Sequence, residues 1–373
     1  MTRTPLTRRS LLCGVATLPL AGCLTVPDIL IVPEAATTGT SETVFVATNR
    51  IFADGQFQNE RQEGLSFTQF DVAIPPDRET GAVQPGRLRR GGPDLQTDFV
   101  ASAGDHLGTA GNFRARLMAE ARRRGTREVM VFIHGFNSTL GTGLYRTAQI
   151  RHDFQIPGLA VHYAWPSAGH PLGYAYDRDS ALFARDRLET LLTEIAAAGL
   201  HIVLTAHSLG SGVVMEVLRQ LRIGGRDDVI NRINGVILFS PDIDVDVFRA
   251  QAARVGQLPQ PFVIFTSQRD RALTISARIT GLRERVGNLS SADQVADYEV
   301  TLIDTSAFEG GVRDPLNHFA GATSPAVVQM LREVAQVNNA FERDVSQQAG
   351  LLPGTILTIQ NATRVMLSPV NLR

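Results

Sequence analysis

Residues 202–212 read Ile-Val-Leu-Thr-Ala-His-Ser-Leu-Gly-Ser-Gly. An apolar run ends here, a serine stands between small residues two positions away on each side, and a helical pattern follows. The pattern predicts a buried strand that turns sharply into a helix, with Ser208 on the turn. A serine there projects its hydroxyl from the edge of a sheet, above the N-terminus of the helix. Ser208 is therefore the candidate nucleophile; the alternative is an ordinary helix N-cap.

The small residues around Ser208 have a steric reason. We expect Ala206 and Gly210 to lie where strand and helix approach each other closely. The usual pattern has glycine at the first of these positions, so Ala206 adds one methyl group.

Short apolar runs rich in branched residues recur from about residue 112 onward, and helical stretches separate them. The runs are Val129–Ile133, Ala160–Ala164, Ile202–Thr205, Val236–Phe239, Phe262–Phe265 and Val300–Ile303. Two extended segments, Thr43–Ala47 and Phe67–Ile74, come earlier in the chain. This alternation predicts an α/β fold with a mostly parallel central sheet and helices on both faces.

A serine nucleophile needs a general base, and in such sheets the order along the chain is serine, acid, histidine. The chain has 8 histidines, and His318 is the only one that follows Ser208. It lies in a loop between the last predicted strand and a helix predicted over Pro325–Val337. We therefore assign His318 as the candidate base; the alternative is a histidine in an ordinary surface loop.

The acid must lie between these two residues. Asp270 is the first choice, because it lies in a loop beyond the carboxyl end of the Phe262–Phe265 strand. A carboxylate there would fix the tautomer of the imidazole. Asp242 is the alternative acid, since it follows the preceding strand; its other possible role is to cap a helix that begins near Val245.

Asp242, Asp244 and Asp246 also have the spacing that begins a calcium-binding loop. The sixth position of such a loop is Val247 here instead of glycine, and the twelfth is Ala253 instead of glutamate. We therefore predict no metal at this segment.

An oxyanion hole needs two backbone N–H groups that point at the developing negative charge. Leu209, the residue after the nucleophile, would supply one of them. The second is expected from the loop after an early strand, where Gly135 lets the backbone turn and Phe136 would donate. The alternative for this loop is a simple glycine turn.

The N-terminus has the features of an export signal. Arg8 and Arg9 precede a short apolar run, Leu11–Leu20, which is too short to cross a bilayer. The sequence Leu20-Ala21-Gly22-Cys23 resembles the processing box of bacterial lipoproteins, in which the cysteine is lipidated. We expect an exported protein held on a bacterial cell-envelope membrane through Cys23; the alternative is a soluble signal peptide with an incidental cysteine.

Composition excludes several kinds of site. All 36 basic residues are arginines, which rules out a Schiff-base lysine, a P-loop lysine and a Ser–Lys dyad. Removal of residues 1–22 leaves 33 basic and 37 acidic residues, a net charge of −4, so no nucleic-acid partner is expected. Cys13 would leave with the signal peptide, so no disulfide is expected in the mature protein.

These patterns divide the chain into four parts. Residues 1–22 are the signal peptide, and residues 23–41, rich in proline, threonine and alanine, are expected to form a tether. Residues 42–340 form the α/β domain. For residues 341–373 an extra strand, a surface wrap and disorder all stay open.

Several motifs together resemble those of bacterial α/β-hydrolase-fold proteins of the esterase/lipase superfamily, many of which have no assigned substrate. Besides the serine segment they are Val44–Arg50, Val72–Pro76, His134–Asn137, Ala164–Ser167, Tyr176–Ala181, Ser240–Asp242 and Ser267–Leu273. The resemblance covers roughly residues 43–340. It implies the fold and the triad positions Ser208, Asp270 and His318, and it implies little about substrate.

The expected activity is hydrolysis of a carboxylic ester, either of a small molecule or of a lipid, through an acyl-enzyme. No metal or organic cofactor is required. Two alternatives stay open: acyl transfer with the same triad, and a catalytically silent envelope protein that uses the fold for binding.

Overall fold

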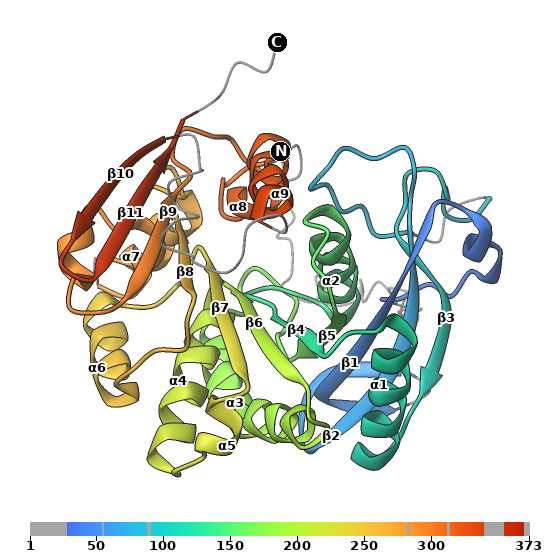
Figure 1. Cartoon of the computed structure of the whole chain (residues 1–373). Helices are drawn as coiled ribbons and strands as arrows, with labels where there is room; N and C mark the ends of the chain where they lie inside the picture. Colours follow the sequence, from blue (N-terminus) through green and yellow to red (C-terminus); the bar gives the residue numbers. More distant parts are fainter. Residues whose placement is uncertain are drawn as a thin grey trace, which may run out of the picture.

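The computed structural model describes residues 28–53, 56–87, 91–281, 284–311, 314–338 and 354–368 of the chain. These residues form an 11-stranded sheet in the order β10-β11-β9-β8-β7-β6-β4-β5-β1-β2-β3 (Figure 1). From β11 to β1 each neighbouring pair is parallel, whereas β2, β3 and β10 join the ends of the sheet as antiparallel strands. The predicted α/β fold with a mostly parallel sheet is confirmed.

The strands are β1 (Thr40–Ala53), β2 (Gln56–Ile74), β3 (Val100–His106), β4 (Glu128–Ile133), β5 (Leu159–Ala164), β6 (His201–His207), β7 (Ile233–Phe239), β8 (Phe262–Thr266), β9 (Val300–Asp304), β10 (Gly354–Ile359) and β11 (Ala362–Leu367). The helices are α1 (Ala110–Arg124), α2 (Leu140–Asp153), α3 (Tyr174–Ala197), α4 (Leu209–Ile223), α5 (Asp227–Ile230), α6 (Val245–Val255), α7 (Arg271–Ile279), α8 (Ala320–Thr323) and α9 (Pro325–Asn338).

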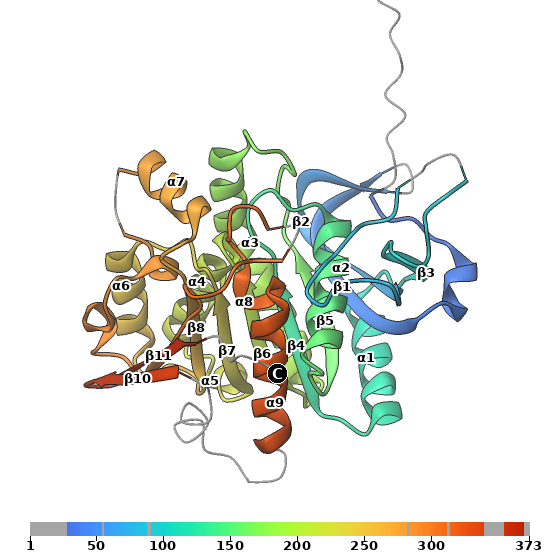
Figure 2. The same cartoon turned by 90° about the horizontal axis from the view of Figure 1, so that it is seen from above.

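Apolar side chains cover both faces of the sheet. In β4 the alternate residues Val129, Val131 and Ile133 belong to a buried cluster with α1, α3, α4 and α6. Met130 and Phe132 point the other way, into a cluster with α2, α8 and α9. In Figure 1, α2, α8 and α9 lie on one side of the strands and α3, α4 and α6 on the other; Figure 2 looks down on α8 and α9, with α2 to their right. A strand with apolar residues on both faces is what a covered parallel sheet requires.

The tether predicted over residues 23–41 is wrong for the part that the structure describes. Leu30 and Ala35 are buried against the domain, and Leu30 O accepts a hydrogen bond of 3.0 Å from the backbone of Ala101. The Asp28 carboxylate accepts hydrogen bonds from Thr139 Oγ1 and the Gly141 N–H at the start of α2. The domain therefore begins before residue 42. The proline- and alanine-rich composition predicts a linker, but contacts with segments far along the chain hold residues 28–41 against the domain.

The C-terminal region also extends the domain. Strands β10 and β11 form a hairpin, and β11 pairs in parallel with β9. Of the three possibilities for residues 341–373, the extra strand is therefore correct for residues 354–368, and the domain does not end at residue 340.

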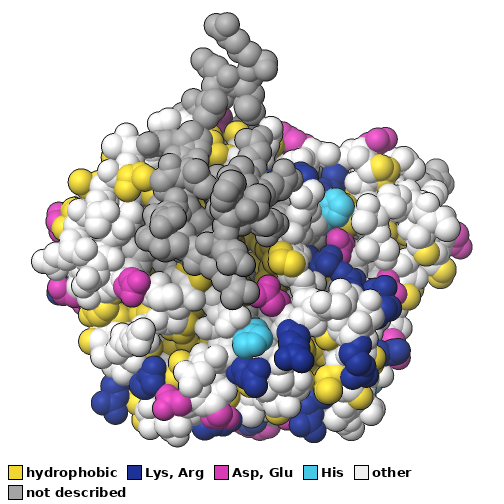
Figure 3. All heavy atoms as spheres, in the orientation of Figure 1, with side chains coloured by type: hydrophobic (Ala, Val, Ile, Leu, Met, Phe, Trp, Pro, Cys, Tyr) yellow, Lys and Arg dark blue, Asp and Glu magenta, His cyan; other side chains and the backbone are white. Residues whose placement is uncertain are grey.

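The signal peptide and Cys23 lie outside the described residues. Within the described ranges, no helix combines the length and the apolar character that a membrane span requires. On the face shown in Figure 3, arginine side chains are interspersed with acidic and apolar ones.

Candidate active site

Ser208 lies on the turn between β6 and α4, where the sequence places it. Its backbone has φ +54° and ψ −123°, a conformation that L-residues rarely adopt. The Ser208 N–H donates to Phe239 O at 3.0 Å, and the Ser208 carbonyl accepts from the backbone N–H groups of Ser211 at 3.0 Å and Asp242 at 3.2 Å. The neighbouring strand and the first turn of α4 therefore hold the serine in a strained geometry, and such strain concentrates at functional sites.

Two glycines lie where the turn leaves no space for a side chain. A Cβ atom on Gly210 would stand 2.4 Å from the carbonyl oxygen of His134 and 2.6 Å from that of Ile133. A Cβ atom on Gly135 would stand 2.8 Å from the Cβ of Ser208. The helix that follows the serine and the end of β4 thus meet backbone to backbone. The close approach expected at Gly210 is confirmed.

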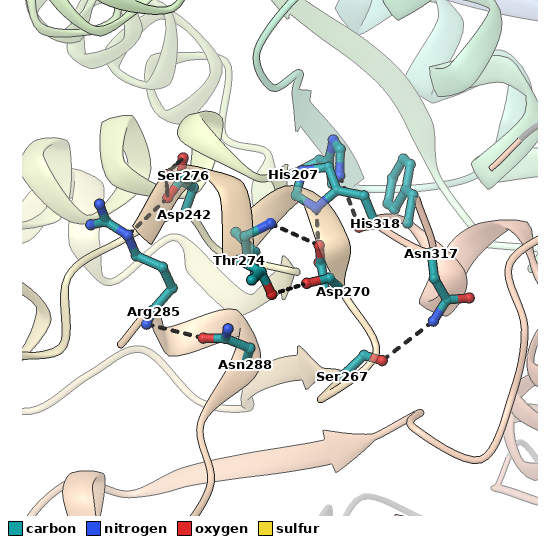
Figure 4. A network of polar contacts seen from close by, with 12 residues as sticks. His207, Asp242, Ser267, Asp270, Thr274, Ser276, Arg285, Asn288, Asn317 and His318 are labelled. Atoms are coloured by element: carbon teal, nitrogen blue, oxygen red, sulfur yellow. Dashed lines mark hydrogen bonds and ion pairs between the residues drawn. The ribbon is translucent and has the colours of Figure 1, made fainter. Parts of the chain in front are cut away.

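Asp270 and His318 are brought together by the fold. His318 Nδ1 lies 2.8 Å from Asp270 Oδ2 (Figure 4). The other carboxylate oxygen of Asp270 accepts from the Leu273 N–H at 2.9 Å and caps α7, so this buried carboxylate has a fixed orientation. Burial alone would lower the pKa of His318, but the charge of Asp270 and its hydrogen bond outweigh burial and raise the pKa above the usual 6.5.

His207 packs between the serine turn and His318. Its ring centroid lies 4.6 Å from that of His318 and 3.9 Å from that of Phe319, and Figure 4 shows it beside His318. Burial holds the pKa of His207 well below its usual value, so the ring is neutral. Its Nε2 lies 3.3 Å from the His318 carbonyl, which can only accept, so Nε2 carries the proton. His207 therefore supports the loop that carries His318, the candidate base.

The hydroxyl of Ser208 makes no hydrogen bond to any described residue, His318 included. Ser208 is 2% exposed. Hydrogen bonds between a nucleophile and its base are often loose until substrate is bound. The fold thus joins Asp270 to His318 and places His318 against the neighbour of Ser208.

Asp242, the alternative acid, belongs to a different network. Its carboxylate accepts from Ser276 Oγ at 2.7 Å and from the Tyr174 hydroxyl at 2.9 Å, and it forms an ion pair with Arg285 at 3.3 Å (Figure 4 shows all but Tyr174). Burial, helped by the charge of Asp242, raises the pKa of Tyr174 to about 12. In the described part of the chain Asp242 makes no hydrogen bond to His318. Asp242 does not cap the helix that begins near Val245, because Asp244 caps α6.

Among the described residues, the backbone N–H groups of Phe136, in the loop after β4, and of Leu209, the first residue of α4, have no acceptor. A first-turn N–H of a helix has no partner within the helix, so the Leu209 donor follows from helix geometry. The Phe136 side chain packs edge-on against Tyr174, with ring centroids 5.4 Å apart. Both N–H groups are free to donate, and their role as donors to an oxyanion stays a prediction.

A cavity of about 180 Å³ opens beside the turn, between α3, α4 and α6. Leu209, Val213 and Ile243 give it an apolar wall, and Tyr174 and Asp242 give it a polar end. Since Leu209 follows Ser208 directly, this cavity is a candidate for a substrate pocket.

No group of three or more potential metal-ligating side chains occurs among the residues that the structure describes. Two of the three aspartates with calcium-like spacing have other partners: Asp242 binds Arg285, and Asp244 caps α6.

When the chain is compared with known families, a large segment matches one of them. Residues 109–334 match the family described as "Alpha/beta hydrolase of unknown function (DUF900)". The chain belongs to this family. This match, together with the mostly parallel sheet, confirms the predicted α/β-hydrolase fold. The matched segment contains Ser208, Asp270 and His318. The family description names no substrate, and membership of this hydrolase family supplies none.

Several solved structures are similar to this hydrolase at low identity. Esterase B of Lactobacillus rhamnosis is 13% identical, with 85% of this chain and 92% of that chain covered and a TM-score of 0.36. An esterase of Pyrobaculum calidifontis is 9% identical, with 81% and 89% covered and a TM-score of 0.37. An esterase of Rhizomucor miehei is 12% identical, with 81% and 86% covered and a TM-score of 0.33. Comparison with curated proteins gives no match. Similarity of this extent does not bear on substrate or mechanism.

The close backbone contact at the turn predicts that alanine substitutions at two neighbouring glycines have opposite effects on stability. Gly210→Ala should lower the free energy of unfolding by about 2 kcal/mol or more, because the new methyl meets carbonyl oxygens that cannot move away. Gly212→Ala, in the same helix, meets nothing nearer than 3.9 Å and should stabilise the protein by about 0.5–1 kcal/mol. Urea unfolding followed by circular dichroism measures both; equal effects would contradict the contact.

Proposed function

We propose that this protein is a serine hydrolase that cleaves carboxylic esters through an acyl-enzyme. The observation that carries the proposal is the hydrogen bond between buried Asp270 and His318, whose ring packs against the neighbour of a strained serine. A base held by a carboxylate, beside a serine at a strand-to-helix turn, is the arrangement that activates a serine nucleophile.

The proposed reaction has two halves. Ser208 Oγ attacks the carbonyl carbon of the ester while His318 takes the hydroxyl proton. Nδ1 of His318 is engaged with Asp270, so Nε2 is the nitrogen that accepts it. His318 then gives this proton to the leaving alcohol, and an acyl group stays on Ser208. Water, deprotonated by His318, then attacks the acyl carbon. The bond to Ser208 Oγ breaks, the acid leaves, and His318 returns the proton to Ser208 Oγ. Asp270 stabilises the imidazolium that forms in each half.

The negative charge that develops on the carbonyl oxygen needs donors. The N–H groups of Leu209 and Phe136 are assigned this role, because neither has another acceptor in the described structure. Loss of one such donor typically costs a factor of about 10²–10³ in rate.

The substrate is proposed to have a short apolar acyl group. The adjoining cavity of about 180 Å³ is smaller than the roughly 300–1,000 Å³ of pockets for drug-sized ligands, and much of its wall is apolar. Either a small-molecule ester or a short-chain lipid ester fits this description. With an alcohol or an amine in place of water, the same residues would transfer the acyl group.

The mature domain should react with a fluorophosphonate probe and hydrolyse a short-chain aryl ester. Ser208→Ala should abolish labelling, and Ser208→Ala and His318→Ala should each lower kcat by at least about 10³-fold, because nucleophile and base act as a unit. Gel fluorescence and absorbance assays measure the two activities. An unmutated protein that neither labels nor turns over ester would instead favour a catalytically silent binding protein.

The same assay separates the two acids. Asp270→Asn should lose on the order of 10³-fold or more in kcat, because the amide cannot hold the imidazole in the required tautomer. Asp242→Asn keeps the Asp270–His318 bond and should lose much less. A greater loss for Asp242→Asn would contradict the assignment of Asp270.

Activity should rise with pH as His318 loses its proton. Because Asp270 raises the pKa of His318, the midpoint of the rise in kcat/KM should lie above the usual 6.5. In Asp270→Asn the charge and hydrogen bond that favour the imidazolium are lost, so the midpoint of the residual activity should move to lower pH. A pH–rate profile of the two proteins measures the shift; a midpoint that stays in place would contradict control by Asp270.

We also propose that the protein is exported and anchored to a bacterial cell-envelope membrane by lipid on Cys23. The support is the sequence alone: a twin arginine, a short apolar run and a lipoprotein-like processing box. Several acyl chains at roughly 0.8 kcal/mol per buried methylene would hold the domain without a spanning helix.

Cys23→Ser should move the protein from the membrane fraction to the soluble fraction, because no acyl chain could then be attached. Membrane fractionation of expressing cells, with metabolic labelling by a fatty acid, measures this change. The catalytic variant Ser208→Ala is the control and should stay in the membrane fraction. Retention and labelling of the Cys23→Ser protein would contradict the anchor.

A further inference from the structure

Asp177 is a buried carboxylate outside the proposed triad. It lies in the first turn of α3 and is fully buried. It accepts hydrogen bonds from the Asn137 N–H at 2.9 Å, the Ser167 hydroxyl at 2.6 Å and the Ala168 N–H at 2.7 Å. Among the described residues it forms no ion pair, so these neutral donors satisfy its charge. A buried carboxylate costs several kcal/mol unless it is well hydrogen-bonded. Its partners all lie in two loops at one edge of the sheet.

Ser167 extends this contact to the next peptide group. Its hydroxyl oxygen accepts from the Ser138 N–H at 3.1 Å while the hydroxyl hydrogen goes to Asp177. Asp177 therefore controls two successive amides of the loop after β4, Asn137 directly and Ser138 through Ser167. Asn137 has φ +56°, a left-handed conformation that the hydrogen bond to Asp177 helps to hold.

Arg50 binds carbonyl groups of the same two loops, the one after β4 and the one after β5. This fully buried arginine from β1 donates to Ser138 O and Trp165 O at 3.1 Å each and to Ser167 O at 3.3 Å. Burial lowers the pKa of Arg50 to about 10, so it is still a cation at neutral pH. A guanidinium suits this position because its several donors have fixed directions.

The two charged residues hold opposite sides of the segment that follows Phe136. Asp177 fixes N–H groups at positions 137 and 138, and Arg50 fixes the carbonyl at position 138. On the other side of Phe136, the His134 carbonyl accepts from Trp165 Nε1 at 2.8 Å. The N–H of Phe136 is left without an acceptor in the described structure, between anchored neighbours.

We infer that Asp177, with Arg50, is a positioning residue that aims the Phe136 N–H at the oxyanion of the reacting ester. This inference rests on the proposed function. A donor helps catalysis only if it is fixed before the charge develops, and a displacement of about 1 Å can cost on the order of 10²-fold in rate. Asp177 itself touches neither substrate nor the reacting atoms.

Asp177→Asn tests this role. The asparagine keeps the shape but has a single acceptor oxygen, and its NH₂ group faces an N–H donor. The expected result on the aryl ester is a fall in kcat of about 10- to 100-fold with KM nearly unchanged. Affinity for a boronic acid, which forms a negatively charged tetrahedral adduct on the serine, should fall by a similar factor.

Asp153→Asn is the matched control. Asp153 is likewise a buried carboxylate; it binds Arg78, the Gly81 N–H and Gln149, at the end of α2. Its substitution should lower thermal stability and leave kcat within about twofold. Ser167→Ala is a second test variant, since it removes the relay to Ser138 while Asp177 stays. It should lower kcat less than Asp177→Asn does.

The outcomes are distinguishable. Three results would overturn the inference alone, provided that the unmutated protein turns over ester. They are equal losses of kcat in Asp177→Asn and Asp153→Asn, an effect of Asp177→Asn confined to KM, and full kcat in Asp177→Asn. An unmutated protein without turnover or labelling would overturn the proposed function, and the inference with it. Amide hydrogen exchange of residues 137 and 138 gives an independent readout: it should accelerate in Asp177→Asn and not in Asp153→Asn. Unchanged exchange in Asp177→Asn would overturn the inference.

Discussion

The contact between the backbone of α4 and the end of β4 is the constraint on which the rest of the site depends. Gly210 packs against the carbonyls of Ile133 and His134, and Gly135 packs against Ser208. The contact fixes the serine turn relative to the loop that carries Phe136, so the proposed nucleophile and the proposed second N–H donor form one rigid unit. Close packing of this kind allows only one arrangement. The loops that carry Asp270 and His318 then need only to bring these side chains to the serine turn, whose position is already fixed.

Much of this site could be predicted because its signals are local or follow from chain order. Consecutive residues around Ser208 predict the turn, and the assignment of His318 follows because it is the last histidine in the chain. Asp270 follows from its place beyond a strand, although Asp242 had a similar place. What separates the two carboxylates is their partners, Arg285 and Ser276 for one and His318 for the other. Those pairings join segments that no local pattern connects.

The parts that the sequence did not predict are contacts between distant segments. Residues 28–41 look like a linker by composition, yet Asp28 caps a helix more than a hundred residues later. Arg50 and Asp177 lie in motifs that carried the family resemblance, but nothing near them in sequence shows that both bind the loop after β4. A buried charge whose partners are neutral groups of other loops leaves no periodic signal. The available clue was only that Arg50 follows the apolar run Val44–Ala47 within a few residues.

If Cys23 carries lipid as proposed, the fixed position of Asp28 limits how far the domain can stand from the bilayer. Five residue steps separate Cys23 from Asp28, a reach of about 18 Å at full extension. With lipid on Cys23, the domain would therefore rest almost on the headgroups, with little freedom to tumble. Asp28 binds the start of α2, and α2 follows the loop of Phe136 directly. Esters concentrated at the lipid–water interface would then meet the enzyme more often than esters in bulk water.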